Sequence, residues 1–339
     1  MKIKRADIER ILILCAAVLV VVLALQDNQP ASTVLVDETQ IPIEQTIALP
    51  EGETVATVVY YQDGDGYLVP VTRQVAKTDG IAKATLSMMV KSSENDMNAA
   101  RLGLRTVIPE GTTFDIDIAD GRANVSMSKE ALNCLSAAEE SQMVDAVVSA
   151  LTCFSTVDEV TLEFDGQKRS KLTFGTDVSG VFTGGNVNLE ATETFSEDAN
   201  QVQLYFPSQT GRLLVPVTRM VYSDADVSTA VLELAKGPQS DSGLERALPE
   251  GCGIRSVTLK DGVVTVDLTQ DFTETLNSTD GGKQAIRALL FTCSQFPGVK
   301  KVDVLVEGQK PQLPEAAQST FINDEQEVMA QYPGVVELD

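Results

Sequence analysis

The chain has 339 residues, 43% of them hydrophobic, and its 26 Lys and Arg against 49 Asp and Glu give a formal net charge of −23. This composition supplies enough apolar material for folded cores, whereas the acidity excludes nucleic acid as a partner because phosphate binding depends on Lys and Arg. There is no histidine, the side chain that most often acts as general base or metal ligand, and no cofactor is expected.

The N-terminal region, residues 1–27, has the pattern of a membrane anchor or signal segment. Basic residues precede an unbroken apolar run at 11–25, and a polar sequence follows. The positive flank is expected to remain in the cytoplasm, which places the rest of the chain outside a single-pass anchor in the cell membrane. Secretion after signal cleavage is the alternative. Residues 28–53, rich in Pro, Thr, Gln and acids, are expected to form a stalk.

Two parts of the chain carry the same order of predicted elements. In the first, strands are expected at 55–61 and 67–74, a helix at 81–90, strands at 114–118 and 123–127, a helix that includes 144–151, and a strand at 160–164. In the second, strands are expected at 202–206 and 213–217, a helix from 227 that stops at Gly237-Pro238, strands at 257–259 and 263–268, a helix that includes 286–293, and a strand at 302–306.

Short motifs return in the same order in these two parts. LVPVTR, PEG, an Asp-Gly turn and GQK all occur twice, so that Pro70 corresponds to Pro216 and Pro109 to Pro249. The repeat is as long as a domain of roughly 100–150 residues. We therefore predict two tandem α+β domains of one topology, at 54–168 and 201–310, with a connector at 169–200 and an irregular tail at 311–339. Each is expected to be a small β-β-α-β-β-α-β unit with two helices on one face of a sheet.

The five cysteines do not form a repeated framework. Cys153 and Cys293 occupy the same repeat position, where a small buried side chain is expected, but Cys134 and Cys252 have no counterparts. No spacing typical of zinc ligands is present. The cysteines are expected to be reduced and structural.

Arg73 and Arg219, which follow Pro-Val-Thr in both copies, are the candidate functional residues. They could make a shared ion pair or interface contact, because interfaces are enriched in arginine, or they could be solvated strand ends. Asp63 and Asp65 resemble a fragment of a calcium loop, but a hairpin turn is preferred because the remaining ligands are missing.

No catalytic residue and no metal ligand is assigned. Asp267 and Asp271 could act as paired carboxylates, yet the first copy has Ser126 and Glu130 at those places. A cap or turn role is therefore favoured for both acids.

The ordered motifs resemble the GerM domain, a sporulation and spore germination module of Firmicutes. The second copy carries the fuller set, namely LVPVTR at 214–219, KGP at 236–238, LPEG at 248–251, VDL at 266–268, Phe272 and EG at 307–308. The first copy departs from it with Lys91-Ser92-Ser93 in place of Gly-Pro. The chain also lacks a convincing lipobox, since Leu14 precedes Cys15.

The resemblance implies a tandem-domain envelope protein, similar to ring-building modules, that is not an enzyme and acts as a scaffold. Its implied partners are other envelope proteins or further copies of itself. A binding module for cell-wall polymer or a germination signal is the alternative, and a histidine-free wall hydrolase is a third. A deep cleft between the domains lined by Tyr and Arg would favour binding, whereas an exposed sheet edge or apolar helix face would favour assembly.

Overall fold

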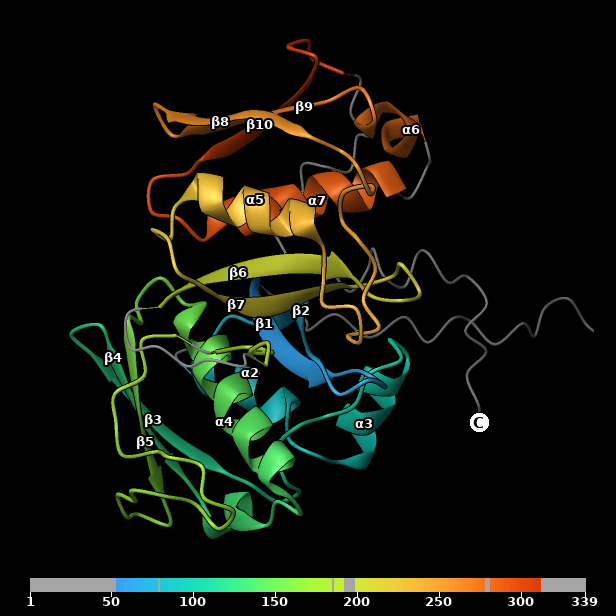
Figure 1. The fold of residues 1–339 in the computed structure, drawn as a ribbon. Helices are drawn as coiled ribbons and strands as arrows, with labels where there is room; N and C mark the ends of the chain where they lie inside the picture. Colours follow the sequence, from blue (N-terminus) through green and yellow to red (C-terminus); the bar gives the residue numbers. More distant parts are fainter. Residues whose placement is uncertain (1–52, 79, 185, 192–198, 278–280, 312–339) are drawn as a thin grey trace, which may run out of the picture. The chain divides into compact units, whose positions relative to one another are not determined.

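The computed structural model describes residues 53–311, except 79, 185, 192–198 and 278–280 (Figure 1). The predicted anchor, most of the stalk and almost all of the tail lie outside these residues. Within the described part of the chain, no helix has the length and apolar character needed to cross a membrane.

The first repeat contains an opening hairpin, a layer of helices and a three-stranded sheet. Its elements are β1 (Thr54–Gln62), β2 (Leu68–Ala76), α2 (Ile81–Met88), α3 (Ser93–Ala100), β3 (Phe114–Ala119), β4 (Arg122–Met127), the 3-10 turn η1 (Lys129–Leu132), α4 (Ala137–Thr152) and β5 (Glu159–Phe164). Strand β1 pairs antiparallel with β2, and β3 pairs antiparallel with β4. Because β4 and β5 are parallel, α4 provides the crossover between them.

The second repeat has the same plan. Its elements are β6 (Asn200–Pro207), β7 (Leu214–Val221), α5 (Val227–Lys236), β8 (Ile254–Lys260), β9 (Val263–Leu268), α6 (Phe272–Asn277), α7 (Gly281–Ser294) and β10 (Lys301–Val306). The hairpin is β6–β7, the sheet order is β10-β9-β8, and β9 and β10 are parallel. The predicted α+β class and the repeated topology are confirmed.

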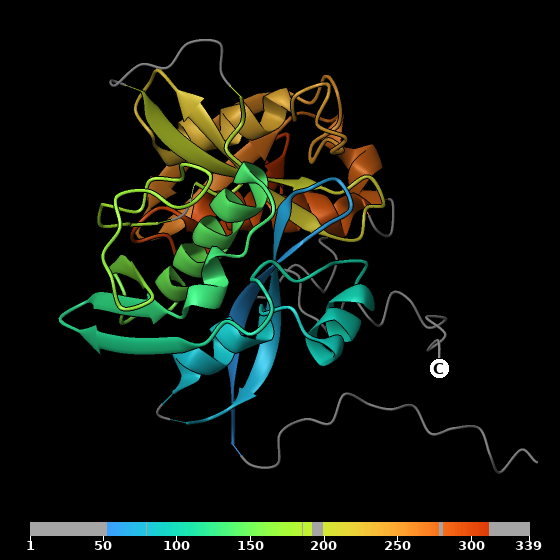
Figure 2. The same cartoon turned by 90° about the horizontal axis from the view of Figure 1, so that it is seen from below.

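The strands of each repeat divide into two sheets, with the helices between them. Helix α4 contacts β1 on one side and β5 on the other, and α7 contacts β6 and β10 in the same way (Figure 1 and Figure 2). The burial of the two hairpins explains why helices cover them. Strands β2 and β7 are buried along most of their length, on both faces, and they contact each other. A strand buried on both faces needs cover on both, and helices provide it on one side.

Local signals explain the boundaries of several elements. The Ser136 hydroxyl accepts a hydrogen bond from the Glu139 amide and caps α4, while the Asp226 carboxylate does the same for α5 through Thr229. Asp120 and Asp261 adopt φ angles of 51° and 53° in the two Asp-Gly turns, which suits tight hairpins between antiparallel strands.

The cysteines differ from expectation in one respect. Cys293 is fully buried, as predicted, but its counterpart Cys153 is exposed where α4 ends. The four described cysteines are free thiols.

Candidate interaction site

Arg219 on β7 holds the connector to the second repeat. Its Nε lies 2.6 Å from Glu190 Oε2 and its Nη2 lies 2.8 Å from Glu190 Oε1, a two-pronged ion pair. The side chains are only 13% and 9% exposed. Burial disfavours the guanidinium charge, yet the ion pairs with Glu190 and Glu233 hold the pKa of Arg219 above its ordinary value.

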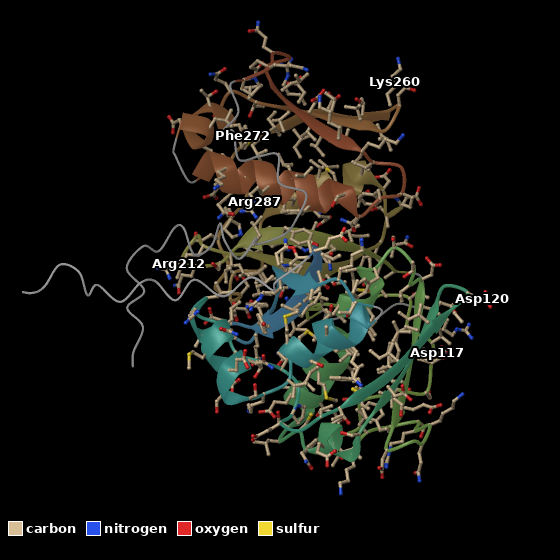
Figure 3. All side chains as sticks on the ribbon, turned by 180° about the vertical axis from the view of Figure 1, so that it is seen from behind. Asp117, Asp120, Arg212, Lys260, Phe272 and Arg287 are labelled. Carbon is tan, nitrogen blue, oxygen red and sulfur yellow. The ribbon has the colours of Figure 1, made fainter. Side chains whose placement is uncertain are left out.

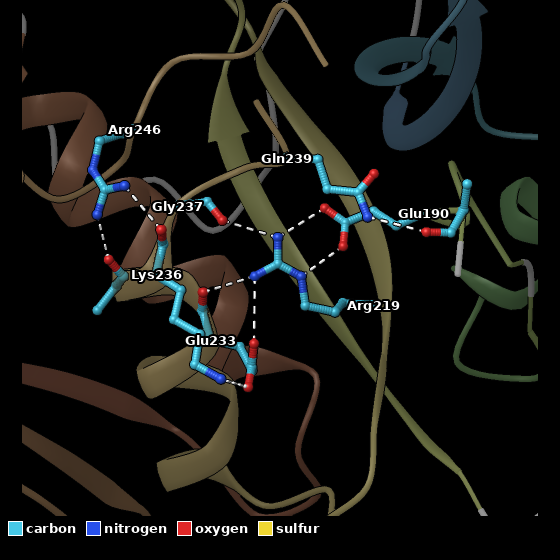
Figure 4. Close-up of polar contacts among 9 residues, drawn as sticks. Glu190, Arg219, Glu233, Lys236, Gly237, Gln239 and Arg246 are labelled. Atoms are coloured by element: carbon cyan, nitrogen blue, oxygen red, sulfur yellow. Dashed lines mark hydrogen bonds and ion pairs between the residues drawn. The ribbon is translucent and has the colours of Figure 1, made fainter. Parts of the chain in front are cut away.

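The same guanidinium reaches the C-terminal end of α5. Arg219 donates to the carbonyl oxygens of Glu233 at 3.0 Å and Gly237 at 2.9 Å, as Figure 4 shows. Arg246 donates to the carbonyls of Ala235 at 2.6 Å and Lys236 at 2.8 Å. Two arginines therefore satisfy the last carbonyls of α5 and complement the negative end of its dipole.

Arg73 has the equivalent place on β2. It is 7% exposed and lies opposite Thr57 in the β1–β2 register. Both arginines thus lie inside the fold, which excludes their being solvated strand ends. Contact of either with another protein stays a prediction.

The connector is bonded to both repeats through Asn188. The Asn188 amide accepts from the Leu68 N–H at 2.8 Å and donates to the Leu68 carbonyl at 2.8 Å and the Pro216 carbonyl at 2.7 Å. Next to it, the Glu190 N–H donates to the Thr218 carbonyl at 2.9 Å. One side chain therefore joins β2 of the first repeat to β7 of the second.

Glu140 fixes the earlier part of the connector. This carboxylate is 1% exposed on α4 and accepts hydrogen bonds from the backbone amides of Phe174 at 2.9 Å and Thr176 at 3.0 Å. These bonds satisfy a buried charge, which would otherwise be costly. No local pattern predicts this role, because Glu140 and its partners Phe174 and Thr176 are separated along the chain by β5 and a loop.

A polar cleft lies where the two repeats and the connector meet. It has a volume of about 420 Å³ and is lined by Gly66, Tyr67, Leu68, Ser141, Gln142, Asp145, Asn186, Asn188, Leu189, Glu190, Ala191, Val217, Gln239, Asp241 and Ser242. Several of these groups bond to one another, as in the hydrogen bond from the Tyr67 hydroxyl to the Ser242 carbonyl at 3.0 Å. One tyrosine and no arginine line the cleft, so it does not have the character expected of a binding module.

Asp145 is the carboxylate in this cleft whose pKa is most altered. Burial raises its pKa to about 6, against a small opposing effect from the Ser141 hydroxyl. A carboxyl poised near neutrality is what a general acid needs, so Asp145 is the residue on which to test for catalysis.

Apolar side chains are exposed on the second repeat. A groove of about 520 Å³ runs between α5 and β8 and includes Leu232, Ala235, Cys252 and Ile254. Leu232 is 51% exposed. The rest of the lining is polar and consists of Ser223, Thr229, Glu233 and Lys236, so Leu232 is an exposed apolar side chain in a mixed surface.

The other candidate acids have structural partners. Asp63 accepts from the amides of Asp65 at 3.0 Å and Tyr67 at 2.8 Å, which forms the predicted hairpin turn. Asp267 accepts from the Gly308 amide at 2.8 Å, and Asp271 accepts from the Thr269 hydroxyl at 2.8 Å. Within the described residues, no group of three or more acids or cysteines is placed to hold a metal ion.

Comparisons with known proteins agree with the duplicated architecture. A family model described as Germane, "Sporulation and spore germination", matches residues 58–170 and 203–312. The chain is 29% identical over 267 residues to the spore germination protein GerM of Bacillus subtilis (strain 168), covering 76% of this chain and 72% of that protein. A solved structure of the tandem GerMN domains of the sporulation protein GerM from B. subtilis matches with a TM-score of 0.70 and 28% identity, over 80% of this chain and 99% of that one.

Proposed function

The chain belongs to the Germane family of sporulation and spore germination proteins, and from this premise we propose that it is a non-enzymatic scaffold of the cell envelope. It works by association with other envelope proteins or with copies of itself. The predicted segment at 1–27 holds it in the membrane, with both repeats outside the cytoplasm.

The exposed sheet edges carry this proposal. Strands β3 and β8 each pair on one side only, and no described segment bridges the other side. Free strand edges are templates for pairing with another chain. The groove beside α5, where Leu232 is exposed, adds a second candidate surface for association. By contrast, two polar groups of the cleft already join the repeats: the Tyr67 hydroxyl donates to the Ser242 carbonyl, and the Asn188 amide bonds to Leu68 and Pro216.

Two substitutions in sporulating cells distinguish association from catalysis. Leu232→Glu replaces the exposed leucine of the groove beside α5 by a charge and is expected to abolish function, because association requires that side chain to be desolvated. Asp145→Asn removes the poised carboxyl and is expected to leave function intact. If Asp145→Asn abolished function while folding and location were unchanged, the protein would be an enzyme.

The location is tested separately by adding protease to intact protoplasts. Degradation of both repeats is expected, because the predicted anchor places them on the outer side. Full protection of the repeats in intact protoplasts, with degradation after lysis, would overturn the proposed orientation.

A further inference from the structure

The cleft between the repeats and the connector has an acidic lining that is only partly neutralised. Asp145, Glu190 and Asp241 line it, and no lysine or arginine does. Glu190 is neutralised by Arg219, which reaches it from β7 (Figure 4). The residues that the structure describes supply no basic partner to Asp145 or Asp241. The cleft therefore keeps two carboxylates without a counter-ion.

Asp145 is the more desolvated of these two carboxyls, since it is half-buried on α4 whereas Asp241 is exposed. Within the described part of the chain, its hydrogen-bond partner is the Ser141 hydroxyl at 3.5 Å, which is a long and weak contact. Desolvation disfavours the charged form of a carboxyl that has no close partner, and it raises the pKa of Asp145 to about 6. A cation bound beside Asp145 would offset this penalty.

The hydrogen-bonding groups that are left over in the cleft are mostly acceptors. The Tyr67 hydroxyl and the Asn188 amide already donate to backbone carbonyls. The Gln239 amide also donates to a backbone carbonyl, at 3.1 Å, and keeps its side-chain oxygen as an acceptor. The carboxylates of Asp145 and Asp241 cannot donate when they are ionised. A ligand that fits these groups must therefore supply the donors itself.

We propose that the cleft binds a primary ammonium group, which pairs with Asp145 and donates to the neighbouring oxygens of the cleft. An ammonium has a positive charge, three donors and no acceptor, so it complements both the charge and the free groups of this lining. The volume of about 420 Å³ lies in the range of small-molecule sites. A metal ion fits less well, since no group of three or more acids or cysteines among the described residues is placed to hold one.

The ammonium can belong to a free small amine or to a lysine side chain of a partner protein, because the chemistry of recognition is the same. The lack of arginine in the cleft, which argues against the binding module expected from the sequence, is the feature that suits the cleft to a cation. The inference goes beyond the proposed scaffold function and does not depend on it. Association through Leu232 needs no ligand, so Asp145→Asn is still expected to leave function in cells intact.

Isothermal titration calorimetry of the full-length chain in uncharged detergent micelles tests the site at pH 8, where Asp145 is ionised. The probes are n-butylamine, as a free amine, and lysine with both its amino and carboxyl ends capped, as a protein side chain. Tetramethylammonium has the same charge but no N–H group, so it is expected to bind at least about ten-fold more weakly than butylamine. Binding of the capped lysine would show that the cleft admits a side chain, and binding of butylamine alone would point to a free amine.

Three variants locate the binding within the molecule. Asp145→Asn is expected to weaken amine binding by at least about ten-fold, because it removes the charge that pairs with the ammonium. Asp241→Asn is expected to weaken it by about three-fold, because this carboxylate is exposed to solvent. The matched control Asp117→Asn removes one charge at an exposed position of β3, which Figure 3 shows on the sheet of the first repeat, and is expected to bind as the wild type does.

The outcomes separate this inference from the proposed function. Equal affinity of Asp145→Asn and the wild type would overturn the site, and so would equal binding of tetramethylammonium and butylamine. Circular dichroism checks the fold of each variant, and if Asp145→Asn did not fold, an unchanged affinity of Asp241→Asn would be the contrary result. Failure of both amines to bind the wild-type chain would overturn the inference and leave the scaffold function standing, since Leu232→Glu tests that function in cells.

Discussion

The two repeats differ where the first helix after the opening hairpin ends. In the first repeat, α2 stops at Met88, Met89 keeps a φ of −90°, and the chain enters α3 shortly afterwards. In the second, α5 stops at Lys236, Gly237 turns with a φ of 86°, and two arginines take the final carbonyls.

In the second repeat, the arginine that follows Pro-Val-Thr binds a residue outside the repeat. Arg219 is paired with Glu190, which comes from the connector between the repeats. The second repeat is therefore tied to a segment outside itself. Four substitutions test the contacts of the connector and of the residues around it, from the largest expected effect to the smallest.

Arg219→Ala is expected to lower the free energy of unfolding by about 3–5 kcal/mol, because it leaves Glu190 buried without its counter-ion. Urea denaturation measures the change. Arg122→Ala is the control, since the pair of Arg122 with Glu159 is solvent-exposed and should contribute less than about 1 kcal/mol. Equal losses for the two variants would contradict the structural role given to Glu190.

Asn188→Ala is expected to cost about 2–3 kcal/mol, because it removes three hydrogen bonds between the repeats and places alanine at a φ of 53°. Asn188→Gly relieves the backbone strain and isolates the effect of the bonds. Thermal unfolding should become less cooperative in both variants. A single sharp transition at the wild-type temperature would show that the two repeats are joined by other contacts.

Gly237→Ala is expected to cost about 1–3 kcal/mol. The positive φ of 86° disfavours any side chain, and an added Cβ would collide with the Arg246 guanidinium, whose Cζ lies 2.9 Å away. Gly211→Ala separates the two causes, because its φ is 66° and the Cβ would meet nothing within 4 Å. Chemical denaturation should show the larger loss at Gly237, and equal losses would exclude a steric contribution from Arg246.

Asp145→Asn is expected to stabilise the protein by about 1–2 kcal/mol at pH 8, the smallest effect and the only gain. The folded-state pKa of about 6 lies above the unfolded value of 3.8, so the ionised carboxylate destabilises the fold above pH 6. This penalty disappears as the pH falls from 6 to below 4. The difference between variant and wild type, measured by denaturation across this range, should vanish at low pH, and a constant difference would refute the assignment.

Sequence patterns predicted the repeated framework because its signals are local. Alternating apolar residues marked β4 and β5, Asp-Gly marked the hairpins, and Gly237-Pro238 marked the end of α5. Helix α3 was missed because SENDMNAA has no apolar stripe and buries one residue, Ala99.

The connector contacts could not be predicted in the same way. Asn188 bonds to Leu68, 120 residues earlier, and no periodicity records such a pairing. The same holds for Glu140 and for the partner of Arg219. These polar contacts depend on how the hairpins meet, which is decided by tertiary packing rather than by local pattern.

The register of the first hairpin determines how the protein would respond to mechanical load. Strand β1 begins at Thr54, which pairs with Ala76, and the mouth of the hairpin is closed by the ion pair of Glu53 with Lys77 at 2.9 Å. If the N-terminal segment holds the chain at the membrane, tension enters at this mouth. The pairs of β1 and β2 would then open one after another, starting from Glu53, instead of resisting together in shear. A pulling force from the membrane would therefore separate β1 from β2 first, and the first repeat would begin to unfold at its N-terminal end.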